Sequence, residues 1–158
     1  MIQRIQTLYL SLIAIAGVLL FFFPLAHYYD EMLGNYKFFI YGVVSMDPEP
    51  KVSFPSLFTL PLVIIVGISI LLTLLTIFMY RNRPLQVRLC AFNLLATIVL
   101  IMVIFFFYAT RIKTMTGIEP EYSYLGMGLP LVSLLFLILS HQAIRKDETL
   151  VKSADRLR

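Results

Sequence analysis

Six polar side chains lie inside two long apolar segments, and their spacing is the clearest sign of built-in polar chemistry. They are Ser69, Thr73, Thr76, Cys90, Asn93 and Thr97. If both segments are helical, each set shares one face, because its members are three, four or seven residues apart. Counted from the turn between the segments, Thr76 matches the depth of Cys90, Thr73 that of Asn93, and Ser69 that of Thr97. We therefore expect two facing polar stripes that hydrogen-bond across the helices.

The same stripes could instead line a polar channel or a ligand cleft. Ionisable residues at membrane depth usually mark such a path, but the middle of each apolar segment lacks Asp, Glu, Lys and Arg. Hydrogen bonds between membrane helices average about 0.6 kcal/mol, so their main effect is to orient the pair. We favour this structural interpretation and keep a transport path as the alternative.

Other residues that could catalyse or bind metal are scattered. The single cysteine, Cys90, allows no intrachain disulfide and excludes a thiol oxidoreductase that needs a cysteine pair. His27 and His141 lie at opposite ends of the expected bundle, too far apart to share one haem or metal. Four carboxylates near the first loop fit no calcium-loop spacing; they are Asp30, Glu31, Asp47 and Glu49. We predict no catalytic residue, metal or cofactor, and rank an enzyme using these carboxylates third.

Four apolar segments must position these residues. Hydrophobic residues make up 59% of the 158 residues, and the mean hydropathy is +0.87, which is typical of a membrane protein. A hydrocarbon core of about 30 Å needs roughly 20 helical residues. Residues 7–26, 59–80, 85–108 and 125–143 reach that length, and lipid requires them to be helices. The predicted fold is an all-α, four-transmembrane-helix bundle that forms one domain.

The first segment could alternatively be a cleaved signal peptide, since Arg4 supplies a basic start. However, Pro24 would then occupy the −3 position of the cleavage site, where a small residue is preferred. The apolar run is also long for a signal peptide. We predict that the first span is retained.

The charges at the segment ends predict the orientation. With the N-terminus inside, the inner parts carry nine basic and three acidic residues, whereas the outer loops carry four basic and six acidic residues. The positive-inside rule thus places both termini in the cytoplasm. The inner basic residues would face anionic lipid headgroups. Nucleic acid is not an expected partner, because no basic run is interleaved with aromatic residues.

The first outer loop, residues 27–58, is prone to β-structure. Residues 36–46 are rich in aromatic and β-branched side chains, Asp47 to Pro50 break the run, and residues 51–54 are predicted to form a short return strand. Residues 112–124 are expected to form a second outer loop.

The tail, residues 144–158, is amphipathic. Ile144, Val151, Ala154 and Leu157 can share one helical face. The tail could continue the fourth helix, bend onto the membrane surface or fray. Its mixed charges favour a protein partner, or the chain's own inner surface, over lipid alone, and we predict a partner-binding element.

Three sequence stretches carry a family resemblance. Residues 1–7, the start of the third segment at Arg88 to Cys90, and the ending from residue 143 occur together in order. In these stretches the chain resembles a bacterial family of small four-span proteins known as domain of unknown function 4293. The resemblance implies an inner-membrane location and no activity, substrate or site residue.

These observations favour a multi-pass inner-membrane protein that is not an enzyme and serves as an interaction or assembly subunit. Its expected partners are membrane lipids and other inner-membrane proteins or itself. The alternative is a small transporter or lipid-handling protein that uses the polar stripe.

Overall fold

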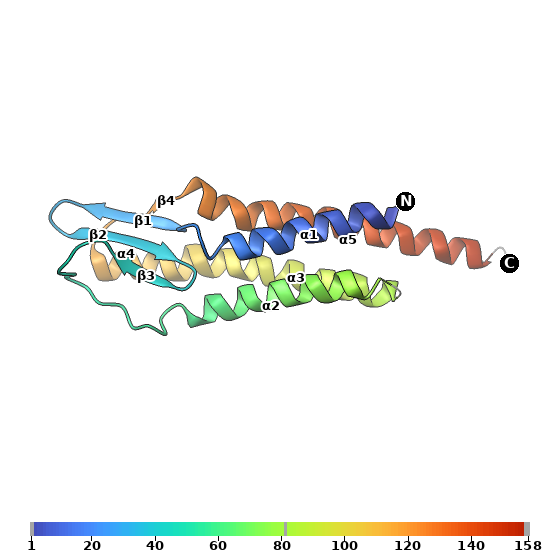
Figure 1. The fold of residues 1–158 in the computed structure, drawn as a ribbon, viewed down its shortest axis with the longest axis horizontal. Coiled ribbons are helices and arrows are strands. Elements are labelled where there is room, and N and C mark those ends of the chain that lie inside the picture. Colours follow the sequence, from blue (N-terminus) through green and yellow to red (C-terminus); the bar gives the residue numbers. More distant parts are fainter. Residues whose placement is uncertain (1, 81, 157–158) are drawn as a thin grey trace.

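The chain is mostly helical, with a small sheet at one end (Figure 1). The structure is a computed structural model that describes the backbone of residues 2–80 and 82–156, and the side chains of residues 5–80 and 82–149. Its helices are α1 (Ile2–Leu19), α2 (Leu60–Phe78), α3 (Arg83–Met102), α4 (Thr110–Thr116) and α5 (Tyr124–Arg156). A π-helical segment, η1 (Val103–Ala109), joins α3 to α4 without a break.

The long helices form an antiparallel bundle in which α1 packs on α5 and α2, and α3 packs on α2 and α5. Three helical stretches are long and apolar enough to cross a membrane: Leu60–Phe78, Arg83–Thr116 and Tyr124–Thr149. Ile5–Leu19 is a shorter apolar helix beside them. Both ends of the described chain lie at the end of the bundle opposite the sheet (Figure 1).

The first helix differs from the predicted range, residues 7–26. It begins at Ile2 and ends at Leu19, and Ala26 belongs to strand β1 (Ala26–Asp30). Pro24 lies between them, and the Leu25 N–H donates to the Phe38 carbonyl at 2.7 Å. The prediction of the helix end was wrong because Leu25 and Ala26 belong to the buried core shared with Phe38 of the sheet and not to the span.

The third helix is longer than the predicted residues 85–108, since α3, η1 and α4 run on to Thr116. The expected loop 112–124 shrinks accordingly. The fourth helix, predicted at 125–143, continues as one helix to Arg156. Of the alternatives for the tail, the structure therefore has the continued helix.

The sheet has four antiparallel strands in the order β3-β2-β1-β4. Strands β2 (Gly34–Phe39) and β3 (Gly42–Ser45) form a hairpin, with Phe39 opposite Gly42. Strand β4 (Glu121–Tyr122) comes from the segment between α4 and α5 and pairs with Ala26 and His27. The sheet thus joins both loops at this end of the bundle.

The β-prone loop is confirmed, but the return strand predicted at residues 51–54 was wrong. That stretch has no strand, because the run 36–46 folds back on itself at Ile40 and Tyr41 and supplies its own partner. Phe54 packs edge-on against Tyr36 and contacts Phe58. It covers the sheet without extending it.

Three buried tyrosines join the sheet, the third helix and the segment of residues 52–58. Tyr28 donates to the Ala109 carbonyl at 3.4 Å, Tyr108 donates to the Phe58 carbonyl at 2.9 Å, and the Tyr36 oxygen accepts from the Val52 N–H at 3.2 Å. Burial raises the pKa of the Tyr28 hydroxyl, and the nearby Tyr122 adds to the rise, so Tyr28 stays a donor. These contacts make the sheet part of the folded core and not a detached loop.

The π-helical segment keeps one face of the third helix in line. The buried residues Leu100, Ile104, Tyr108, Ile112 and Thr116 are each four apart. In a regular α-helix, residues spaced by four would rotate around the helix axis by about 160° over these four steps, because one turn takes 3.6 residues. The i→i+5 hydrogen bonds of η1 hold more residues per turn and reduce this rotation where Tyr108 meets the sheet.

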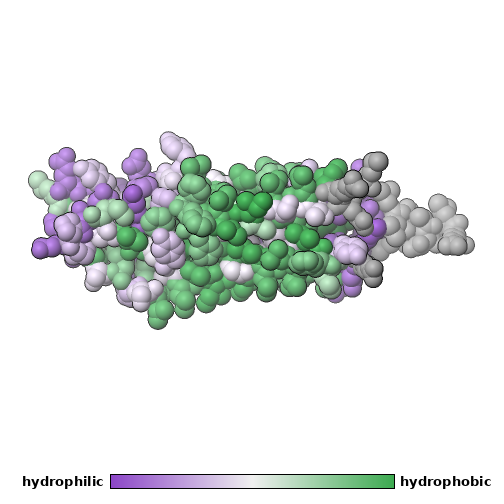
Figure 2. Space-filling view, viewed as in Figure 1, coloured by the Kyte–Doolittle hydropathy of each residue, from purple (hydrophilic) through white to green (hydrophobic). Residues whose placement is uncertain are grey.

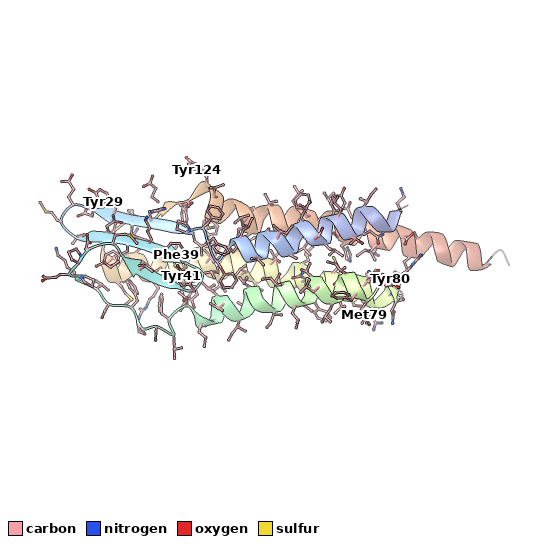
Figure 3. The ribbon with its side chains drawn as sticks, viewed as in Figure 1. Tyr29, Phe39, Tyr41, Met79, Tyr80 and Tyr124 are labelled. Atoms are coloured by element: carbon pink, nitrogen blue, oxygen red, sulfur yellow. The ribbon has the colours of Figure 1, made fainter. Side chains whose placement is uncertain are left out.

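The surface divides into a hydrophobic band and a more hydrophilic sheet end (Figure 2). Aromatic residues border the band: the half-buried Phe39 and the exposed Tyr41 and Tyr124 lie toward the sheet, and the exposed Tyr80 lies beside Met79 at the α2–α3 turn (Figure 3). Tyr29 lies beyond this border, toward the outer tip of the sheet (Figure 3). Such borders are typical of interfacial aromatic belts.

Candidate functional site

The predicted stripe forms a hydrogen-bonded network centred on Asn93. The Asn93 side-chain N–H donates to Thr73 Oγ1 at 2.7 Å, and Ser69 Oγ donates to Asn93 Oδ1 at 2.6 Å. Asn93 is 1% exposed and Thr73 is 0% exposed. The bond from Asn93 to Thr73 confirms the pairing expected from equal depth.

Hydroxyls within the network also bond to their own helices. Thr73 donates to the Ser69 carbonyl at 2.8 Å, Thr97 to the Asn93 carbonyl at 2.9 Å, and Thr76 to the Leu72 carbonyl at 2.7 Å. This back-bonding satisfies Ser and Thr protons inside an apolar helix. It leaves their oxygen lone pairs free to accept from a neighbouring helix, as Thr73 does from Asn93.

Two of the three pairs that depth predicts, Thr76 with Cys90 and Ser69 with Thr97, are not hydrogen-bonded in the structure. Cys90 directs its thiol at the Leu137 carbonyl of α5, at 3.6 Å. Ser69 bonds Asn93, and it shares only a small cavity with Thr97. Counting along two helices fixes depth but not rotation, and it takes no account of α5, which packs on the same side of α3.

Sequence reasoning missed Gln86, which lies on the same face as Cys90 and Asn93. Its side chain is 6% exposed and donates to the Thr76 carbonyl at 2.8 Å. That carbonyl is among the last four of α2, which lack partners within the helix. The spacing of four residues from Cys90 and seven from Asn93 is the signal that could have identified it.

Among the described side chains, two buried polar atoms remain without a hydrogen bond at the end of the bundle opposite the sheet. They are Gln6 Nε2 on α1 and Ser140 Oγ on α5. The stacking of Tyr9 on Phe136 fixes the antiparallel register, which puts Gln6 and Ser140 at nearly the same depth. These two polar groups therefore lie near each other along the α1–α5 contact, and neither has a hydrogen-bond partner in the described part of the chain.

Of the four predicted tail residues, the structure describes the side chain of Ile144 alone. Ile144 is 1% exposed and belongs to a core cluster with Leu10, Cys90 and Leu137, so it is not a docking residue. Val151 and Ala154 lie on the continued α5, but their side chains are outside the described part, and Leu157 is outside the described residues altogether. An ion pair of Arg83 with Asp147, at 3.4 Å, ties the α2–α3 turn to α5 just before this point.

Two of the four carboxylates that the sequence analysis considered, Asp30 and Asp47, accept hydrogen bonds from backbone N–H groups at the sheet end. Asp30 Oδ1 accepts from the Met32 and Leu33 N–H groups, and Asp47 Oδ2 accepts from the Asn35 N–H at 2.6 Å. A hollow of about 530 Å³ lies between these loops and is also lined by Glu31 and Glu49. Among the described side chains, no three His, Cys, Asp or Glu residues lie close enough together to hold a metal ion.

Comparison with known proteins gives a family and no activity. The sequence model of the family described as domain of unknown function (DUF4293) matches residues 2–157. The chain belongs to this family. The resemblance noted in the first seven residues, in the third helix and in the tail is thereby confirmed over almost the full length. No curated protein and no solved structure matches the chain.

Proposed function

We propose that this DUF4293 protein is a non-catalytic subunit of the bacterial inner membrane that binds other membrane proteins or a second copy of itself. Four helices would cross the membrane, with both termini in the cytoplasm. Since α1 lies beside α5 and α2 in the bundle, we count it as the fourth span. The charge distribution supports the orientation, because the sheet end carries most acidic residues.

The main support for a non-catalytic subunit is that the interior of the bundle leaves little room for a ligand or a transport path. Its polar groups at mid-depth bond one another, and the cavity beside them has a volume of about 20 Å³. Small-molecule sites typically occupy about 300–1,000 Å³. This interior supports a scaffold more than the alternative, a transporter that uses the polar stripe, which would need a larger opening in a second conformation.

The projecting end of α5 is the proposed contact element. The stacking of α1 on α5 and the Arg83–Asp147 ion pair show that α1 and the α2–α3 turn both end near residue 147 of α5. Beyond this point α5 continues alone to Arg156 (Figure 1). Val151 lies seven residues beyond the buried Ile144, on the same side of the helix. An apolar face past the end of the bundle needs a partner to cover it.

Truncation tests this role. Removing residues 149–158 should leave the protein inserted, because the bundle is intact, but should dissociate an oligomer or a co-purifying complex after gentle solubilisation. The finer variant replaces Val151 and Leu157 with Gln. Its matched control replaces Lys152 and Arg156, on the opposite face, with Gln. If the apolar and control variants keep every association of the full chain, the tail is not the docking element.

A further inference from the structure

A small cavity lies at the centre of the bundle, where all four long helices meet. Its volume is about 20 Å³. Three hydroxyl side chains from three helices line it: Ser69 of α2, Thr97 of α3 and Ser133 of α5. Ser69 is midway along α2. Because a cavity of about 10–15 Å³ admits one water molecule, this one has room for about one.

Two of the three hydroxyls offer only lone pairs to the cavity. Ser69 already donates its proton to Asn93 Oδ1 at 2.6 Å, and Thr97 donates to the Asn93 carbonyl at 2.9 Å. Each hydroxyl has one proton and two acceptor sites. A molecule in the cavity must therefore donate to Ser69 and to Thr97.

The third hydroxyl has the opposite capacity. Ser133 is 6% exposed, and no hydrogen bond joins it to another group in the described part of the chain. Its proton is therefore available to a molecule in the cavity. A buried hydroxyl without a partner is destabilising, and lipid offers no alternative partner at this depth.

We propose that this cavity binds one ordered water molecule, which donates to Ser69 and Thr97 and accepts from Ser133. Water matches the cavity in size, and its two protons match the two acceptors. Buried waters typically make about three hydrogen bonds. Through the water, α5 joins the network that Asn93 forms between α2 and α3. The proposal does not depend on the partner-binding role of the tail.

A structure of the full chain, determined in lipid at a resolution that shows ordered water, tests the site directly. We expect an oxygen peak about 2.5–3.0 Å from the three hydroxyl oxygens. An empty cavity, in a map that resolves waters of similar order elsewhere in the protein, would overturn the proposal.

A pair of serine variants tests the bonding. Ser133→Ala removes the hydroxyl donor among the described residues that line the cavity, so the peak should be lost and the unfolding temperature should fall. Ser140→Ala is the matched control, a buried serine on the same helix seven residues away that does not line the cavity. It should keep the water and should not lower the unfolding temperature, since Ser140 Oγ is buried with no hydrogen bond to any described group. An unchanged peak in Ser133→Ala would contradict the proposal.

A double-mutant cycle gives a second test that does not require a map. The structure shows no direct hydrogen bond between Ser133 and Thr97, so coupling between Ser133→Ala and Thr97→Val must pass through the cavity that both line and through its contents. We expect the double variant to lose less unfolding temperature than the two single variants together. Strict additivity would overturn the proposal, and if Ser133→Ala does not insert, the cycle with Ser133→Gly replaces it.

Discussion

Asn93 is the residue on which the interior network depends. Its amide bonds Thr73 and Ser69 on α2, and its backbone carbonyl accepts from Thr97. The spacing of the stripe predicted this contact, because residues at equal distance from a tight turn meet in an antiparallel pair. The partner of Cys90 was not predictable in this way, since it is the Leu137 carbonyl of α5, which is distant in sequence.

A double-mutant cycle should reveal the pairing of Asn93 with Thr73. We expect the double variant Asn93→Leu with Thr73→Val to lose less free energy of unfolding than the two single variants together. The coupling energy should be about 0.6 kcal/mol and at most ~2 kcal/mol. The measurement is the free energy of unfolding in bicelles. Asn93→Leu with Thr114→Val is the control, because Thr114 bonds only its own helix outside the network, and this pair should be additive.

Gln6 is a buried polar residue whose side-chain amide nitrogen has no hydrogen-bond partner among the described residues. Its Nε2 is buried without a hydrogen bond, which costs about 1–3 kcal/mol. Gln6→Met has a similar shape and no such group, so it should raise the free energy of unfolding by about 1 kcal/mol. Chemical or thermal unfolding in detergent measures this. A loss of stability would mean that the Gln6 amide has a partner in the membrane.

At the scale of elements, the helices follow from hydropathy, whereas the sheet depends on contacts between distant segments. Strand β1 lies partly within an apolar run that reads as a membrane span, and β4 exists only because residues 121 and 122 meet Ala26 and His27. The start of α5 reaches this junction, where the Ser123 N–H donates to the Leu25 carbonyl at 3.0 Å. No local pattern encodes such pairing.

Glycine at position 126 is required by that junction. A Cβ atom there would lie 1.9 Å from the Pro24 carbonyl oxygen, whereas a Cβ at Gly128 would meet nothing within 4 Å. Gly126→Ala should therefore lower the unfolding temperature clearly. Gly128→Ala is the matched control and should be neutral or stabilising by up to about 1 kcal/mol, since Ala is the better helix former. Equal effects would show that α5 does not cross the chain so closely.

The π-helical segment makes a prediction about deletions. Removing Phe106, which is 72% exposed, should let η1 return to α-helix and keep Tyr108 toward the sheet. Removing Leu95, which is 58% exposed and lies in regular α-helix, should rotate Thr97 and Leu100 out of the core by about 100°. We expect the Phe106 deletion to remain monodisperse on size exclusion and the Leu95 deletion to aggregate. The reverse ranking would contradict the role of η1.

At the scale of the whole molecule, the two ends of the bundle differ in form and charge. One end carries the sheet and the acidic loops, and the other carries the tight turn and the projecting helix (Figures 1 and 2). Both ends of the described chain lie at one end of the bundle, and the charges assign that end to the cytoplasm in the proposed orientation. The proposed orientation therefore needs a direct chemical test.

Labelling of introduced cysteines supplies that test. Met32, at 83% exposure, lies at the sheet end, and Asn82 is exposed at the opposite turn. In intact cells, a membrane-impermeant maleimide should modify Met32→Cys and leave Asn82→Cys unmodified until the membrane is opened. The native Cys90 is 1% exposed, so the unaltered chain should stay unlabelled and serves as the control. Labelling of Asn82→Cys from outside, with Met32→Cys protected, would reverse the orientation and place the projecting end of α5 outside the cytoplasm.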